Sequence, residues 1–223
     1  MTTRRNLPYA PEHGRFGLLD VVLPDEPKGA PVVIVYHGGG LRALRKERMT
    51  HVAEFVARCG YVAVNTNYRL LPEAEFPAPV EDALRVVDWV QAADNAPLEG
   101  ADVSQVAVLG ASAGGYLVLM VGLLLGEARV SGIVSIAGPA THHCGVRHER
   151  LWRLPDGRAL APPVGLVGDS TPPQLCVHSV NAELVRPSES RAIVERVRAS
   201  GSRAELYEFD GPGKQHGIWR DES

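Results

Sequence analysis

Ser112 is the residue whose surroundings point most directly to chemistry. It lies in the run Gly-Ala-Ser-Ala-Gly-Gly at 110–115, between the apolar run 106–109 and the apolar stretch 116–125. This order predicts a strand, a tight turn and a helix, with the serine on a turn whose close backbone approach requires small neighbours. The first N–H groups of the helix would face the place where an attacked carbonyl develops negative charge. Ser112 is therefore a candidate nucleophile.

A second motif, His37-Gly38-Gly39-Gly40, directly follows the apolar run 32–36. The glycines then lie at the carboxyl end of a buried strand, where ligands collect in open parallel sheets. Because Gly38 and Gly39 lack a Cβ, their amides can turn inward, and we expect them to hold an oxyanion together with the amide of Ala113. The two motifs, each behind a β-rich apolar run and in this chain order, predict an α/β-hydrolase fold.

Hydrolysis by a serine also needs a base that takes the hydroxyl proton and returns it to the leaving group. His216 lies behind the last expected strand, in Gly-Lys-Gln-His-Gly at 213–217, where the glycines let a loop bend over the sheet edge. It follows Ser112 in the chain, as this fold requires, so we expect it to be the base. His37, beside the glycines, is expected to brace their loop by hydrogen bonds.

Apolar runs alternate with helical patterns along the chain, which is typical of parallel strands joined by helical crossovers. We expect strands at 18–23, 32–36, 61–65, 106–109, 132–137, 174–178 and 204–209, and helices at 46–59, 77–92, 116–125 and 188–199. They predict one α/β-hydrolase domain over 1–223: a mostly parallel, doubly wound sheet with helices on both faces and little or no cap. The stretch from Thr141 to Thr171 has little periodicity and is expected to line the substrate pocket, with or without forming a lid.

Several segments resemble the hormone-sensitive-lipase-like esterases, over a match that runs from about Leu19 to His216. The segments are 37–40, 67–72, 76–83 and 110–115, while 9–11 and 19–24 are similar to the feruloyl-esterase-like and kynurenine-formamidase-like members with little or no cap. Such a resemblance implies the fold strongly and the substrate weakly. We interpret Tyr68-Arg69 and Glu81-Asp82, which belong to these segments, as a structural network that ties a helix to the loop after a strand.

The chain departs from these relatives at the acid that would orient the base. In the relatives an aspartate stands four residues after the histidine that ends the seventh strand, and alignment on His178 and Val185 puts Ala182 there. An alanine can neither orient an imidazole nor stabilise its charged form. Glu183 is our preferred substitute because its longer side chain can reach back toward the base.

Other polar residues near this position remain alternatives. Asn181 would fix the ring of His216 without supplying a charge. Asp169 and Asp210 are weaker alternatives, because neither stands where the chain order predicts an acid. We expect the substrate to be contacted by three further residues: Gly40, Tyr116 and Trp152. Trp219 is a further candidate for the pocket.

Three functions are compatible with these motifs. The leading hypothesis is a serine hydrolase that cleaves a small carboxylic ester, or a related acyl bond, through an acyl-enzyme on Ser112. Because Ala182 stands at the acid position, a second hypothesis is a cyclase, dehydratase or lyase in which His216 and the oxyanion hole polarise a carbonyl. A third hypothesis is a non-catalytic small-molecule binder, against which the presence of both Ser112 and His216 argues.

Composition narrows the ligand class. The 223 residues are 45% hydrophobic and 22% charged, with a net charge of −3, which is ordinary for a soluble globular protein. Nothing resembles a basic surface for nucleic acid or anionic membrane, so we expect a small-molecule substrate and no cofactor. The N-terminus has no apolar signal region and no segment has the length of a membrane span, so we expect a cytoplasmic enzyme. We also expect a homodimer, in which a second copy of the chain pairs with an edge strand of the sheet.

The cysteines and clustered histidines suggest no metal site. The chain has three cysteines, Cys59, Cys144 and Cys176, and their spacing is not that of metal ligands. We expect no disulfide. Cys59 and Cys176 are expected in the core. The His142-His143-Cys144 run, with His148 nearby, has no suitably spaced carboxylate and is interpreted as a polar loop.

Overall fold

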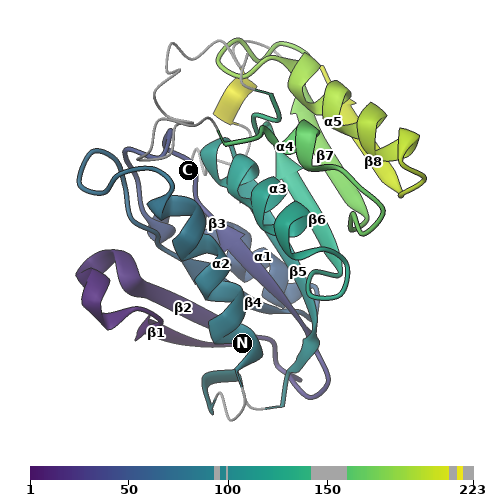
Figure 1. Ribbon diagram of the computed structural model, residues 1–223. Coiled ribbons are helices and arrows are strands. Elements are labelled where there is room, and N and C mark those ends of the chain that lie inside the picture. Colours follow the sequence, from purple (N-terminus) through teal and green to yellow (C-terminus); the bar gives the residue numbers. More distant parts are fainter. Residues whose placement is uncertain (93–95, 99, 142–159, 211–214, 218–223) are drawn as a thin grey trace.

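An eight-stranded sheet forms the centre of the protein (Figure 1). The structure, a computed structural model, describes residues 1–92, 96–98, 100–141, 160–210 and 215–217. The sheet order is β1-β2-β4-β3-β5-β6-β7-β8. The strands are β1 (Thr2–Pro8), β2 (Leu18–Leu23), β3 (Pro31–Tyr36), β4 (Val62–Thr66), β5 (Asp102–Ala111), β6 (Gly132–Ile136), β7 (Gln174–Ser179) and β8 (Ala204–Phe209).

All pairings from β4 to β8 are parallel, while β2 pairs antiparallel with both β1 and β4. In the centre, Tyr36 at the end of β3 lies beside Gly110 on β5, and Ala111 lies beside Ile136 on β6. Because parallel strands end at one edge of a sheet, the turns after β3, β5 and β8 gather there. This arrangement confirms the predicted α/β-hydrolase fold with a mostly parallel sheet.

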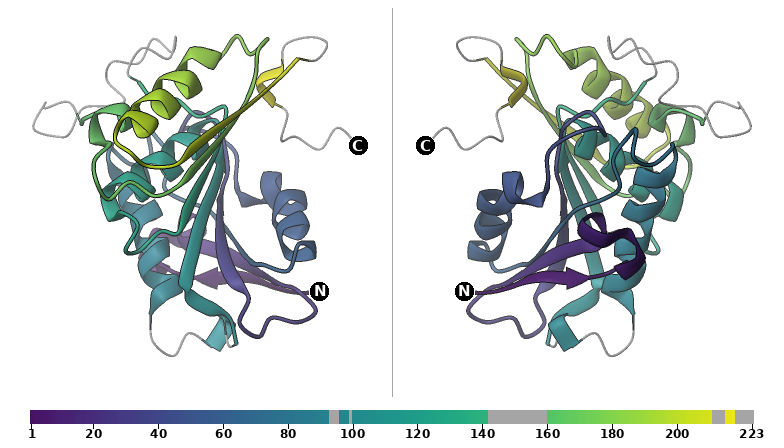
Figure 2. Two further views of the ribbon diagram at one scale, coloured as in Figure 1. Left: turned by 90° about the vertical axis from the view of Figure 1, so that its right-hand side faces the viewer. Right: turned by 90° about the vertical axis from the view of Figure 1, so that its left-hand side faces the viewer.

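Helices cover both faces of the sheet (Figure 2). On one face lie α2 (Ala78–Gln91), α3 (Ala113–Leu125), the short α4 (Pro163–Leu166) and α5 (Pro187–Ala199), and on the other lies α1 (Thr50–Arg58). Helix α2 buries Val80, Ala83, Val87 and Val90, as its apolar periodicity predicts. Helix α3 is apolar on all sides because it packs against both the sheet and α2. None of the described helices combines the length and apolar character needed to cross a bilayer.

One strand was not predicted, one predicted helix differs in type over its first turn, and one cysteine was placed wrongly. Strand β1 was not expected, because its sequence TTRRNLP has no apolar alternation; its position follows from edge pairing with β2. The helix expected over 46–59 is a 3-10 turn, η2 (Lys46–Met49), followed by α1. Cys59 is exposed instead of lying in the core, because it caps the C-terminal end of α1, in the turn before β4; Cys176 is buried as expected.

A buried ion pair joins the antiparallel end of the sheet to η2. The Lys46 Nζ donates to Asp20 Oδ1 over 2.7 Å, and both side chains are almost inaccessible to solvent. Asn67 Oδ1 accepts from the Lys46 N–H, and Asn65 Nδ2 donates to the Lys46 carbonyl. Buried charges need such partners, so Lys46 fixes the start of α1 against β2 and β4.

Candidate active site

The turn between β5 and α3 places Ser112 in a conformation that is rare for a residue with a side chain. Ser112 has φ 55° and ψ −116°, in the left-handed half of backbone space. A Cβ on Gly114 would lie 2.2 Å from the Tyr36 carbonyl oxygen, and one on Gly110 would lie 2.2 Å from the Gly114 oxygen. The small residues of the motif therefore permit close contact between this turn and the end of β3, as the sequence predicts.

The structure brings Ser112 and His216 together although 104 positions separate them in the chain. The Ser112 Oγ lies 2.9 Å from Nε2 of His216, which belongs to the 3-10 turn η5 (Gln215–Gly217) behind β8. Ser112 is 9% exposed and His216 is 8% exposed. This distance suits transfer of the hydroxyl proton to the imidazole.

The glycine loop after β3 lies next to this pair. In this loop Gly38 is buried and Gly40 is exposed. Gly39 has φ 114°, and a Cβ at this position would lie 2.0 Å from the Ala43 carbonyl oxygen. Only a glycine fits at that position without strain. An oxyanion site formed by the amides of Gly38, Gly39 and Ala113 stays a prediction, and so does a contact between Gly40 and substrate.

His37 supports the loop through its ring and its backbone. Its Nδ1 lies 2.7 Å from the Gly38 carbonyl oxygen, which can only accept, so Nδ1 carries the proton. The ring stacks on Tyr68 with centroids 4.3 Å apart, and the Tyr68 hydroxyl donates to the His37 carbonyl. Burial lowers the pKa of His37 to about 4, so the ring is neutral near pH 7. These contacts hold the glycine loop in place, which is the role that the sequence predicts for His37.

The loop after β7 contains the residues considered for the third member of the site. Glu183 and Asn181 are exposed, Ala182 is buried, and Asn181 Nδ2 donates to Asp210 Oδ1 over 2.7 Å. A contact between Glu183 and the base stays a prediction. Asp169 is exposed before β7 begins, so it lies toward the opposite edge of the sheet from Ser112.

His178 closes this loop. Its Nε2 donates to the Val185 carbonyl over 2.9 Å, which leaves Nδ1 to accept from the Ser190 hydroxyl over 2.7 Å. Burial lowers the pKa of His178, which favours this neutral form. His178 and Val185, the two residues that define the expected position of the acid, are therefore joined by a hydrogen bond.

The remaining predicted residues are divided between the core and undescribed segments. Tyr116 is 1% exposed and lies in the core beneath the turn, where burial raises the pKa of its phenol. Its predicted contact with substrate is untested. Trp152, Trp219, the 142–144 run and His148 lie outside the described residues, and within the described ones no group of three metal-ligating side chains forms a cluster.

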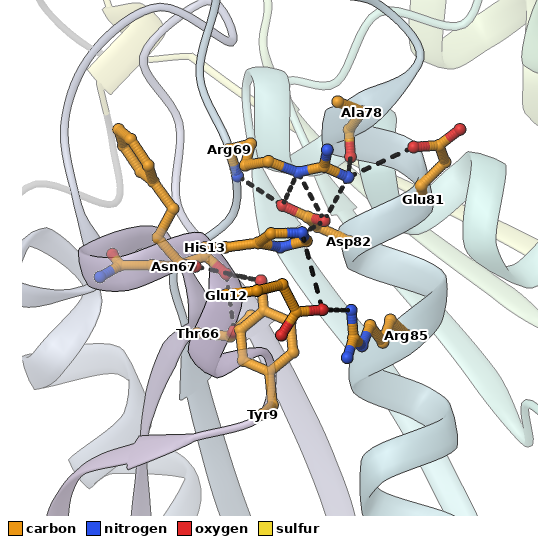
Figure 3. A network of polar contacts seen from close by, with 11 residues as sticks. Tyr9, Glu12, His13, Thr66, Asn67, Arg69, Ala78, Glu81, Asp82 and Arg85 are labelled. Carbon is orange, nitrogen blue, oxygen red and sulfur yellow. Dashed lines mark hydrogen bonds and ion pairs between the residues drawn. The ribbon is translucent and has the colours of Figure 1, made fainter. Parts of the chain in front are cut away.

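A network of polar side chains, which we call the polar junction, links the 3-10 turn η1 (Pro11–Gly17), the loop after β4 and α2 (Figure 3). Asp82 on α2 accepts from the Arg69 N–H over 2.7 Å and from the Arg69 guanidinium over 2.7 Å, and Arg69 also pairs with Glu81. This geometry agrees with the expected network of Tyr68-Arg69 and Glu81-Asp82. No pattern in the sequence predicts its other members: Glu12, His13 and Arg85.

We predict that Gly114→Ala destabilises the protein by about 1–3 kcal/mol, because its methyl group would overlap the Tyr36 carbonyl and force the turn away from β3. Urea unfolding measures the effect. Gly168→Ala is the matched control, since a Cβ there meets nothing within 4 Å, and its change should stay within about 0.5 kcal/mol. Equal stabilities of the two variants would contradict the close approach.

The lowered pKa of His37 predicts an acid-sensitive fold. Because the unfolded chain binds a proton near pH 6.5 and folded His37 only near pH 4, its contribution is present above pH 6.5 and is lost as the pH falls toward 4. The loss amounts to roughly 3 kcal/mol. In His37→Asn, whose amide replaces the Nδ1 donor, the free energy of unfolding should fall less steeply between pH 6.5 and 4. Parallel pH profiles for the two proteins would contradict the assignment.

Comparisons with known proteins agree with this architecture. The BD-FAE family model matches residues 19–144. Esterase LipC of Mycobacterium tuberculosis is 28% identical over 96% of this chain and 60% of that protein. An acetyl ester-xyloside bifunctional hydrolase from Caldicellulosiruptor lactoaceticus aligns with a TM-score of 0.74 and 25% identity, covering 90% of this chain and 80% of that one.

A truncated carbohydrate esterase from gut microbiota shares the fold, with a TM-score of 0.79 and 19% identity over 100% of this chain and 92% of that one. The chain spans about 60% of the length of LipC and less of other curated relatives. Since the family model covers more than half of the chain, the protein belongs to the BD-FAE family, and its fold is that of the α/β-hydrolases.

Proposed function

We propose that this protein is a serine esterase that cleaves a small carboxylic ester through an acyl-enzyme on Ser112. The observation that carries the proposal is the 2.9 Å distance between His216 Nε2 and the Oγ of Ser112. Ser112 itself lies on a strained turn, with φ 55°. Membership of the BD-FAE family and the likeness to proteins named as esterases support it. The substrate's acyl and alcohol groups are proposed to be small.

In the proposed reaction His216 takes the proton of Ser112 as Oγ attacks the ester carbonyl. The amides of Gly38, Gly39 and Ala113 stabilise the negative charge on the carbonyl oxygen. His216 then returns the proton to the departing alcohol, which leaves the acyl group on Oγ. A water molecule, deprotonated by the same imidazole, releases the acid and restores the hydroxyl.

We propose Glu183 as the carboxylate that orients His216. It lies in the loop after β7, next to Ala182, where the resemblance to the hormone-sensitive-lipase-like esterases would place an aspartate. The buried Ala182 also favours a second candidate function, a lyase or cyclase that uses His216 and the glycine amides without an acyl-enzyme. The two candidates differ in whether Ser112 becomes covalently modified during turnover.

We predict that Ser112→Ala lowers the hydrolysis of p-nitrophenyl acetate by about 10⁴-fold or more, because the nucleophile is lost. Ser104→Ala, on the exposed beginning of the same strand, is the matched control and should keep full activity. Mass spectrometry should find a fluorophosphonate on Ser112 of the wild type. Equal rates for wild type and Ser112→Ala, or no label, would refute the acyl-enzyme.

We predict that Glu183→Gln lowers kcat by about 10²-fold to 10⁴-fold while KM changes little, because an amide cannot stabilise the charged imidazole. Glu195→Gln is the control, since Glu195 is an exposed carboxylate on α5. An unchanged kcat in Glu183→Gln would remove Glu183 from the mechanism and leave the assignment of Ser112 intact.

A further inference from the structure

The two outer strands of the sheet present different edges. Strand β1 carries two arginines and a proline, and its register with β2 shifts between Arg4 and Leu7. Positive charges, proline and bulges are features that keep a sheet edge from pairing with another chain. Strand β8, at the other end of the sheet (Figure 1), contains no proline and pairs with β7 in unbroken register. Since β7 is its one partner in the described part of the chain, the edge at β8 is open.

The backbone of β8 directs hydrogen-bonding groups away from the sheet. The Arg203 carbonyl accepts from the first N–H of β7 over 3.0 Å, and the Phe209 carbonyl accepts from the N–H that follows β7 over 3.0 Å. Successive residues of a strand direct their peptide groups to opposite sides, so every second residue from 203 to 209 faces β7. The N–H and C=O groups of Ala204, Leu206 and Glu208 therefore face outward.

Helix α5 occupies one end of this open edge. Arg198 Nε donates to the Ala204 carbonyl over 2.9 Å, so a further strand would have to displace its guanidinium there. Within the described residues, Leu206 and Glu208 then remain with outward backbone groups that no side chain takes up. These two residues flank Tyr207, so the available donors and acceptors are arranged symmetrically about Tyr207.

On the face of the sheet opposite α5, this edge carries aromatic side chains. Tyr207 is 61% exposed, and its ring stacks on Phe209 with centroids 6.4 Å apart. In register with Tyr207 lie Val177 on β7 and Ile136 on β6, which are both only partly buried, so the three form an apolar row across the end of the sheet. Helix α1 packs on this face against β2, β3 and β4, away from the row. Such an exposed row beside an open edge favours association.

A second copy of the chain fits this edge in one register. Two identical strands that pair about a two-fold axis run antiparallel, and one residue lies opposite its own copy. Among the four central residues of β8, Glu205 or Leu206 in that place would set the partner strand across the occupied Ala204 carbonyl. Glu208 in that place would oppose two carboxylates, which is unfavourable. The remaining central residue is Tyr207.

We propose that β8 pairs with β8 of a second copy of this chain, about a two-fold axis at Tyr207. The outward N–H and C=O groups of Leu206 in each copy bind those of Glu208 in the other. The two Tyr207 rings lie against each other and join the apolar rows of the two sheets. Because the edge at β1 is protected, assembly stops at a closed dimer and does not continue into a filament. The proposal concerns assembly and does not depend on the proposed esterase activity.

Cross-linking through single cysteines tests the register. Every variant also carries Cys59→Ser and Cys144→Ser, so that neither of these thiols competes. Tyr207→Cys should form a disulfide-linked dimer on mild oxidation, because residues directly opposite each other in antiparallel strands bring their Cβ atoms within disulfide reach. Glu205→Cys, on the same face of the same strand, is the matched control and should stay monomeric. A mixture of Glu205→Cys and Phe209→Cys should cross-link, because these two positions lie opposite each other in the proposed register.

Sedimentation velocity measures the association without a cross-link. The wild type should pass from monomer to dimer between about 1 and 200 µM, because an interface one strand wide belongs to the small, weak class. Tyr207→Glu opposes two carboxylates and removes the aromatic pair, so it should raise the dissociation constant of the dimer by about tenfold or more. Tyr61→Glu, at another exposed tyrosine beside β4, is the control and should leave that constant unchanged.

Three results would overturn the proposed dimer: a wild type that stays monomeric at every concentration, a dissociation constant that Tyr207→Glu leaves unchanged, or cross-linking of Glu205→Cys as fast as that of Tyr207→Cys. The last result would mean another register or chance collisions. None of these measurements uses an ester substrate, so a failure of the dimer would leave the proposed esterase activity standing, and a failure of the esterase would leave the dimer standing.

Discussion

The close approach of the β5–α3 turn to the end of β3 is the contact on which the rest of the site depends. The backbone at Gly114 lies so near the carbonyls of Tyr36 and His37 that there is no room for a side chain. This contact sets the position of Ser112 and of the glycine loop relative to one another. A serine that faces an oxyanion site on a neighbouring loop needs that fixed relation, because electrostatic stabilisation depends on donors held in place before the charge develops.

Buried polar contacts hold the loops around this centre. His37 is neutral and bound to the Gly38 carbonyl, while Tyr68 ties the same backbone to the loop after β4. The junction around Asp82 then secures that loop to α2, and His178 closes the loop after β7 in a similar way. Each is a buried donor or acceptor whose partner lies on another segment, so the loops are rigid without secondary structure of their own.

The elements that could be predicted have strong local signals. The strands and helices around Ser112 follow from apolar runs, small residues and glycines within a few positions of one another, and the fold class follows from their order. Cys59 was misplaced because the apolar residues on either side of it in the sequence do not reveal that it lies in the turn after α1, where its side chain meets solvent. His13 gave no signal, because a lone histidine in a polar segment looks alike whether it meets solvent or a buried carboxylate.

The sequence by itself determined the order of the strands and helices, the turn that bears Ser112 and the need for glycine beside it, since hydrophobic periodicity and steric limits act over short stretches of chain. Only the tertiary structure decided that His216 lies 2.9 Å from Ser112, that Asp20 is the partner of the buried Lys46 and that His13 faces Asp82. Those contacts depend on how strands align in the sheet and how distant segments pack, which short-range patterns of residue type and spacing do not specify by themselves.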